Sequence, residues 1–189
     1  MRSHCQLHRL MLAVAMTFAA TVSAHQSAKP VAATPAVAST ASPALPASVQ
    51  NIAPAAIEAV KVVDGFSAAI KAARLDDAAK LLDPDVLILE SGSSERSRAE
   101  YLRKHAREDA AFMQTAQQQL RYRKAWADGE VAWVGSESVL QTVKDGKPLR
   151  LLSSETMLLR NGPQGWKIVH IHWSSRRAPE SQQQRNPAT

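Results

Sequence analysis

Two histidines stand two residues apart near the C-terminus, in the stretch WKIVHIHWSS of residues 166–175. Alternate side chains of an extended strand point to opposite faces, so His170 and His172 share one face. The other face of that strand carries three apolar side chains: Val169, Ile171 and Trp173. Side chains two apart are separated by roughly 6.5 Å along the strand, and both imidazoles could therefore reach one metal ion if a third ligand joined them.

No third ligand is evident beside this histidine pair. His105 is alone on a predicted helix, and the single cysteine, Cys5, falls near the N-terminus. A pair at this spacing without a third ligand is a weak metal motif. The alternative is that both imidazoles pack and hydrogen-bond at the surface of a sheet while the apolar face turns to the core. The sequence thus predicts no metal and no other cofactor.

Four strand-like segments occupy the C-terminal half, and this stretch is the last of them. The first three are QLRYRKAWA, EVAWVGSESVLQTV and LRLLSSETMLLR. Asp128-Gly129 and Asp145-Gly146 separate them, and such Asp-Gly pairs between β-rich runs are strong hairpin signals. The third turn is formed by residues 161–165. These patterns predict an antiparallel meander.

Helical periodicity dominates the preceding part of the chain. Apolar residues recur at intervals of three and four, which predicts an amphipathic helix: Ile57, Val60, Val63, Phe66 and Ile70. A short helical turn follows over residues 75–82, and after Pro84 the run DVLILES predicts a buried strand. Helices first and a meander last indicate an α+β domain, with a curved, mostly antiparallel sheet wrapped over its helices.

A further helix is predicted between that strand and the meander. Ser97 stands three residues before Glu100, which is the spacing of a capping box, and the helix would run towards Met113. Its charges have mixed signs, with Glu108 and Asp109 close to several arginines, and this is typical of a solvated helix face. The pattern does not indicate a nucleic-acid-binding surface.

The N-terminal 24 residues have the features of a secretory signal peptide. Arg2 and Arg9 precede a short apolar run that ends in the small residues Val22-Ser23-Ala24. Cleavage after Ala24 would remove Cys5 and change the formal net charge from +6 to +4. The run is too short for a membrane-spanning anchor, so the mature protein is expected to have no membrane span and to be periplasmic or secreted.

Composition divides the remainder of the chain. Residues 25–53 are rich in Ala, Pro, Ser and Thr and are predicted to form a disordered linker. Residues 54–177 form the predicted domain, whose length is typical of a single domain. Residues 178–189 are polar and are predicted to form a flexible tail.

The order of elements, together with the ending GWKIVHIHWSS, resembles the nuclear transport factor 2-like superfamily. Within it the chain is similar to the SnoaL-like and ketosteroid isomerase-like branch and to the association domain of calmodulin-dependent kinase. The helical half matches through AAIKAARLDDAAKLLDPDVLILESG. The resemblance implies a cone-shaped α+β barrel whose concave face holds a small-molecule cavity. It also implies a homodimer formed through the outer sheet face, with His170 and His172 in the interface.

The resemblance also implies where catalytic residues would lie. Steroid isomerases of this superfamily use a carboxylate base, a tyrosine and a protonated acid. The base position falls on Glu90 and the later acid on Glu155, but the tyrosine position falls on Phe66, which has no hydroxyl. Loss of one oxyanion-hole donor typically costs about 10²–10³ in rate. Tyr101 or Tyr122 would have to supply that donor from elsewhere.

Aromatic side chains suggest a ligand pocket within the cone. Five residues are candidates to line it: Phe66, Tyr101, Tyr122, Trp126 and Trp173. Two interpretations of function remain open. The first is an exported, non-catalytic domain that binds a small molecule or serves assembly. The alternative is an isomerase-like enzyme that uses Glu90 and Glu155 for acid–base chemistry.

Overall fold

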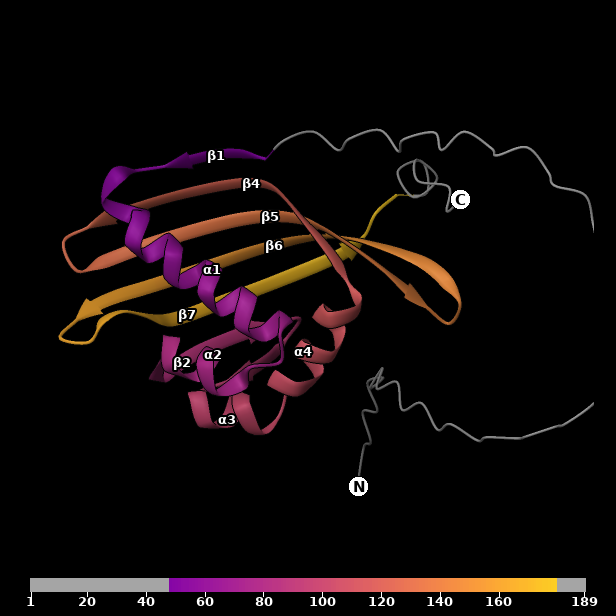
Figure 1. Ribbon diagram of the computed structural model, residues 1–189, viewed down its shortest axis with the longest axis horizontal. Coiled ribbons are helices and arrows are strands. Elements are labelled where there is room, and N and C mark those ends of the chain that lie inside the picture. Colours follow the sequence, from indigo (N-terminus) through magenta and orange to yellow (C-terminus); the bar gives the residue numbers. More distant parts are fainter. Residues whose placement is uncertain (1–47, 180–189) are drawn as a thin grey trace, which may run out of the picture. The chain divides into compact units, whose positions relative to one another are not determined.

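The structure, a computed structural model, describes residues 48–179 (Figure 1). The predicted signal peptide, residues 25–47 of the predicted linker and residues 180–189 of the predicted tail lie outside the described residues. The helical elements are η1 (Pro54–Ala56), α1 (Ile57–Lys71), α2 (Leu75–Leu81), α3 (Arg98–Arg103) and α4 (Ala106–Thr115). The strands are β1 (Val49–Ile52), β2 (Leu82–Glu90), β3 (Ser93–Glu95), β4 (Gln117–Asp128), β5 (Val131–Lys144), β6 (Lys147–Gly162) and β7 (Gly165–Arg177).

The apolar spacing of the N-terminal half produces the predicted amphipathic helix. Val63, Phe66 and Ile70 are buried on the face of α1 that turns to the sheet. The predicted cap is also present, since the Ser97 hydroxyl accepts a hydrogen bond of 3.1 Å from the backbone N–H of Glu100. The segment after this cap forms two helices, α3 and α4, where the sequence predicts one. None of the described helices has the length and apolar character needed to cross a membrane.

The strands form one curved sheet with the order β1-β4-β5-β6-β7-β2-β3. Strands β4 to β7 make the predicted antiparallel meander, and β2 pairs in parallel with β7. Figure 1 shows α1 lying across one face of the meander, with α2, α3 and α4 gathered beyond β7. The α+β class is confirmed. Residues 49–52, which the sequence places in the linker, form β1 and pair in parallel with β4.

Strand β7 contains a β-bulge that changes the predicted alternation. The register with β6 shifts between the pairs Leu158–His170 and Leu159–Ile168, so one residue, Val169, is left without a partner. As a result Ile168 rather than Val169 turns inward and is fully buried. Alternation resumes beyond the bulge, where Ile171 is fully buried. The prediction of the inward face is therefore wrong for Val169 and correct for Ile171.

The register of the meander aligns side chains into rows on two faces. We call the face that packs on α1 the inner face and the opposite face the outer face. One inner row comprises Arg123, Ser136, Glu155 and Trp173, and the next comprises Leu120, Ser138, Ser153 and Ser175. One outer row comprises Trp126, Trp133, Leu158 and His170. The next outer row comprises Lys124, Gly135, Thr156 and His172. Both predicted interface histidines thus lie on the outer face.

Candidate functional site

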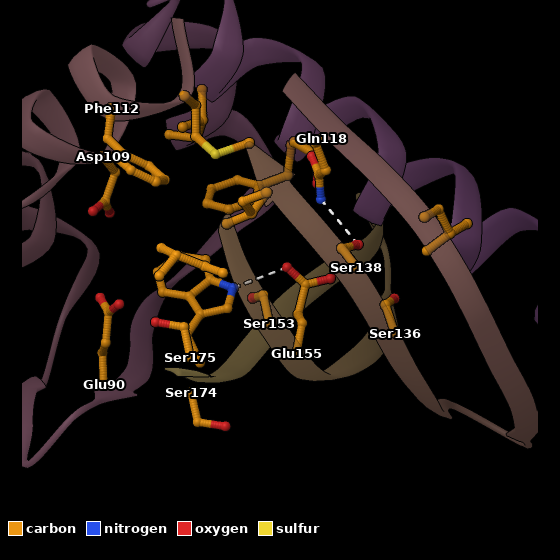
Figure 2. A pocket seen from close by; sticks show the side chains of 18 of the residues that line it. Glu90, Asp109, Phe112, Gln118, Ser136, Ser138, Ser153, Glu155, Ser174 and Ser175 are labelled. Atoms are coloured by element: carbon orange, nitrogen blue, oxygen red, sulfur yellow. Dashed lines mark hydrogen bonds between the residues drawn. The ribbon is translucent and has the colours of Figure 1, made fainter. Parts of the chain in front are cut away.

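A cavity of about 510 Å³ lies between the helices and the inner face of the sheet (Figure 2). The helices contribute an apolar wall: Phe66, Ile70, Phe112 and Met113. The sheet contributes hydroxyl groups from one inner row, namely Ser138, Ser153 and Ser175. Three small side chains aligned across neighbouring strands leave space that larger residues would fill, so the cavity follows from the residue sizes in that row.

Glu155 lies in the sheet wall of this cavity. The indole Nε1–H of Trp173, directly opposite on β7, donates a hydrogen bond of 2.9 Å to Oε2 of Glu155 (Figure 2). Burial raises the pKa of Glu155, and this effect is only partly offset by the Trp173 hydrogen bond and by the positive charge of Arg123. The side chain is therefore a carboxyl group that holds its proton more tightly than an exposed glutamate does.

Arg123 is the cationic side chain beside Glu155. Its Nε–H donates to the Ser136 hydroxyl at 3.1 Å, and its Nη1 lies 2.6 Å from Oδ1 of Asp64 on α1. The guanidinium is buried, whereas most of the Asp64 side chain is exposed. These contacts fix Arg123 between the helix and the sheet at one end of the cavity.

A second carboxyl group, Glu90, stands at the other end of the cavity and faces Asp109. Glu90 ends β2 and Asp109 belongs to α4, and Figure 2 shows their carboxyl groups pointing towards each other. Burial raises the pKa of Glu90, and the charge of Asp109 raises it further. Burial also raises the pKa of Asp109, although the Tyr101 hydroxyl lowers it by donating a hydrogen bond of 2.8 Å to Oδ2.

A histidine–carboxylate pair lies behind these two groups. Nδ1 of His105, just before α4, donates to Oε1 of the buried Glu95. The charge of His105 lowers the pKa values of Glu90 and Asp109, while the charge of Glu95 raises them. These charged groups make this end of the cavity an electrostatically coupled cluster.

The structure brings some of the predicted pocket residues together. Phe66 and Trp173 both line the cavity, with their rings stacked at 6.4 Å and an interplanar angle of 17°. Tyr101 is fully buried behind them, at 6.5 Å from Phe66 and 6.3 Å from Trp173 between ring centroids. Its hydroxyl is directed to Asp109 and not to Glu155.

Tyr122 and Trp126 do not line this cavity, so the prediction for these two residues is corrected. Arg123 and Ala125 are the buried, inward residues of β4, and the alternation of the strand puts Tyr122 and Trp126 on the outer face. Trp126 is 44% exposed.

Within the described part of the chain, no group of three or more His, Cys, Asp or Glu side chains is arranged to hold a metal ion.

Several residues of the site were missed by sequence reasoning. The helix containing Asp109 was interpreted as a solvated face, which is wrong for Asp109 because its side chain lines the cavity. Tyr101, His105 and Asp109 are spaced four residues apart, and this spacing would place them on one helix face with an apolar neighbour, Phe112. This spacing is the sequence signal that could have indicated a polar site on that helix. No local pattern marked Arg123.

Comparisons with known proteins establish the family. The sequence profile of the SnoaL-like domain matches residues 60–178, so the chain belongs to the SnoaL-like domain family. Among solved structures, a candidate ketosteroid isomerase from Shewanella frigidimarina is 29% identical, with a TM-score of 0.60, covering 66% of this chain and 99% of that one. The resemblance derived from the sequence is confirmed.

Two further solved structures share the fold at lower identity. A candidate dehydratase of the NTF2-like family from Streptomyces avermitilis is 19% identical, with a TM-score of 0.55, covering 65% of this chain and 96% of that one. The CaMKII hub of S. rosetta is 23% identical, with a TM-score of 0.54, covering 66% of this chain and 98% of that one. A comparison with curated proteins found no significant match.

The raised pKa of Glu155 has a consequence for stability. Because the folded state holds this proton more tightly than the unfolded state, the free energy of unfolding falls as pH rises from the unfolded pKa through the folded one, and it stays lowered above that. Glu155→Gln removes the titration and keeps the shape. We expect the variant to gain stability relative to the parent as pH rises above 4.5, the ordinary pKa of a glutamate.

Urea denaturation at a series of pH values measures this difference in the free energy of unfolding. Glu130→Gln is the matched control, because Glu130 is exposed in the turn between β4 and β5. The control should show no comparable gain with pH. A difference between the Glu155 variant and the parent that does not change with pH would contradict the assignment.

Proposed function

We propose that this chain is an exported SnoaL-like domain that binds a small molecule in the cavity between α1 and the sheet. The single observation that supports it most is the content of that cavity. Its size falls in the usual range for ligand sites, and it combines an apolar, aromatic wall with a few buried polar groups. Such polar groups orient a ligand, whereas the apolar wall supplies most of the affinity.

The stacked rings of Phe66 and Trp173 suggest the kind of ligand. Both rings line the cavity, and beside them the Glu155 carboxyl accepts the Trp173 N–H. An apolar molecule with one or two fused rings would bury its area against this wall. Hydrogen-bonding groups at its edge would meet the carboxyl and hydroxyl groups of the sheet.

Export rests on the sequence of the N-terminal segment. Arg2 and Arg9, the short apolar run and the small residues before His25 have the order of a cleavable signal peptide. The sequence after Ala24 contains no cysteine. Its folded part would therefore be stabilised by packing, without a disulfide, in a periplasmic or extracellular location.

A cavity-filling substitution tests the ligand site. Three naphthyl probes that differ in one group, 2-naphthylmethanol, 2-naphthylmethylamine and 2-naphthoate, are titrated into the protein by isothermal calorimetry. We expect saturable binding of at least one probe. Ser153→Phe, which places a ring inside the cavity, should weaken that binding about tenfold or more.

Ser154→Phe is the matched control, because Ser154 is the next residue of β6 and does not line the cavity. It should leave probe binding unchanged. Failure of all three probes to bind, or binding that survives Ser153→Phe in a folded variant, would contradict a ligand site in this cavity.

We also propose that the outer face forms a homodimer. Trp126 pairs directly with Trp133 across β4 and β5, and Leu158 continues the row. The Trp133 ring lies over Gly135, where an added Cβ would stand 2.5 Å from a ring atom. The absence of a side chain at Gly135 lets the indole lie flat on the sheet, which creates a broad apolar surface suited to self-association.

The dimer can be tested at His172, which is exposed on the outer face. His172→Asp would bury a carboxylate in the interface without a partner, so we expect the dimer mass to fall to that of the monomer. Light scattering after size exclusion measures the mass. Gln114→Asp, an exposed change of the same charge on α4, should leave the dimer intact. An unchanged mass for His172→Asp would count against this interface.

Acid–base catalysis is the second candidate function, and one observation favours it. Glu90 and Glu155 both open into the same cavity, and burial raises the pKa of each. A raised pKa brings a carboxyl group closer to the range in which it can exchange protons near neutral pH. Against this, Phe66 supplies no hydroxyl, and the hydroxyl of Tyr101 is already bonded to Asp109.

The enzyme interpretation predicts turnover of a β,γ-unsaturated ketosteroid, followed by the ultraviolet absorbance of the conjugated product. One carboxylate would remove the proton between the alkene and the carbonyl and return it to the far alkene carbon. Glu90→Gln and Glu155→Gln should then each lower kcat by about 10²- to 10⁴-fold, while Glu130→Gln has no effect. Absence of turnover in the parent protein would leave binding as the function of the cavity.

A further inference from the structure

The cavity has an excess of carboxyl groups over cationic side chains. Four carboxyl residues line it, Asp64, Glu90, Asp109 and Glu155, against a single guanidinium, Arg123. That guanidinium lies at the Glu155 end, where it contacts Asp64 and the Ser136 hydroxyl. The Glu90 end therefore has no arginine or lysine among the residues that line the cavity.

Glu90 and Asp109 are the two carboxyl groups at the end of the cavity that no arginine or lysine lines. They come from β2 and α4, and their carboxyl groups point towards each other across the end of the cavity (Figure 2). His105 is the nearby cationic group, but its Nδ1–H is directed to Glu95. Two facing carboxylates in a partly buried site repel each other and lose hydration, and a cation between them would relieve both costs.

Aromatic side chains line the same cavity as Glu90 and Asp109. Phe112 is on the same helix as Asp109, and Figure 2 shows both side chains directed into the cavity. The stacked pair Phe66 and Trp173 forms the adjoining wall. The faces of aromatic rings attract cations, most of all ammonium groups that have lost part of their water. An apolar body attached to the cation would lie against the same rings.

We propose that the ligand of this cavity is a protonated amine on an apolar ring frame, with its ammonium group held between Glu90 and Asp109. This inference rests on the proposed function of the cavity as a ligand site and specifies its ligand class. The hydroxyl of Tyr101 holds Oδ2 of Asp109, so that the carboxyl group keeps its orientation towards Glu90. The ring frame fills the space beside Phe66 and Trp173.

A neutral ligand is the competing possibility. The two carboxyl groups would then share one proton, and a hydroxyl or carbonyl group of the ligand would hydrogen-bond to the pair. A ligand carboxylate would add a further negative charge to this end and is disfavoured in either case. The three classes are distinguished by probes that have the same ring system and differ only in charge.

The experiment compares the three naphthyl probes by calorimetry with the full chain. We expect 2-naphthylmethylamine to bind about tenfold or more tightly than 2-naphthylmethanol, and 2-naphthoate to bind most weakly. Glu90→Gln and Asp109→Asn should each weaken the amine about tenfold or more and change the alcohol little. Glu130→Gln, an exposed change of the same charge in the turn between β4 and β5, should change neither.

A measurement on the parent protein avoids dependence on folding of the variants. Glu90 and Asp109 ionise as pH rises, and both pKa values are raised, so the affinity for the amine should rise as pH increases above the ordinary carboxyl pKa of about 4, while the affinity for the alcohol stays flat or falls. The charged and titratable groups around the pair are Glu95, Tyr101, His105 and Glu108.

The outcomes separate the two proposals. Binding of the alcohol or the carboxylate as tightly as the amine, with loss of that binding in Ser153→Phe, would overturn the amine and retain the ligand site. The amine proposal would also be overturned if the affinity for 2-naphthylmethylamine did not change in Glu90→Gln and Asp109→Asn, or did not change with pH. Failure of all three probes would contradict the ligand site itself.

Discussion

The position of Trp173 is the constraint on which the cavity depends. Its indole N–H is bonded to Glu155 on the neighbouring strand, and its ring stacks on Phe66 of α1. Strand β7 pairs with β6 on one side and with β2 on the other, so its register also places Glu90 opposite Trp173. Trp173 thereby connects the sheet with α1. It also lies between Glu155 at one end of the cavity and Glu90 at the other. The bulge at Val169 brings Ile168 to the inner face on which Ile171 and Trp173 already lie by alternation.

Burial in the cavity disfavours the charged forms of its carboxyl groups. Burial raises the pKa of Glu90, Asp109 and Glu155, which means that each carboxylate loses hydration that its neighbours do not fully replace. A protein selected for stability alone would place apolar residues at such positions. The three carboxyl groups beside aromatic rings therefore support the proposal of a ligand site in this cavity. The fold tolerates the cost because α1 and the rest of the inner face bury a continuous apolar core.

The sequence determines the architecture more directly than it determines the site. Apolar periodicity located α1, and Asp-Gly turns located the meander, because both patterns express local geometry. The bulge at Val169 carries no local signal, and a single inserted residue is enough to exchange Ile168 for Val169 at the core. Simple alternation also fails to predict the face on which Trp126 lies. A second bulge in β4, between Leu120 and Tyr122, changes which residues of that strand point inward. The Glu90–Asp109 pair could not be predicted from either segment alone, because it forms only when β2 and α4 meet.

Alternate residues of the same strands form the two faces of the sheet. On β6, Glu155 opens into the cavity while the next residue, Thr156, belongs to an outer row with His172. Neighbouring residues can therefore change independently, one altering the cavity and the other the outer face. In this chain the serine row gives the cavity its size, and four carboxyl groups beside a single guanidinium give it its polar character. The same α+β frame with larger inner residues would be a filled core, and its outer face would be unchanged.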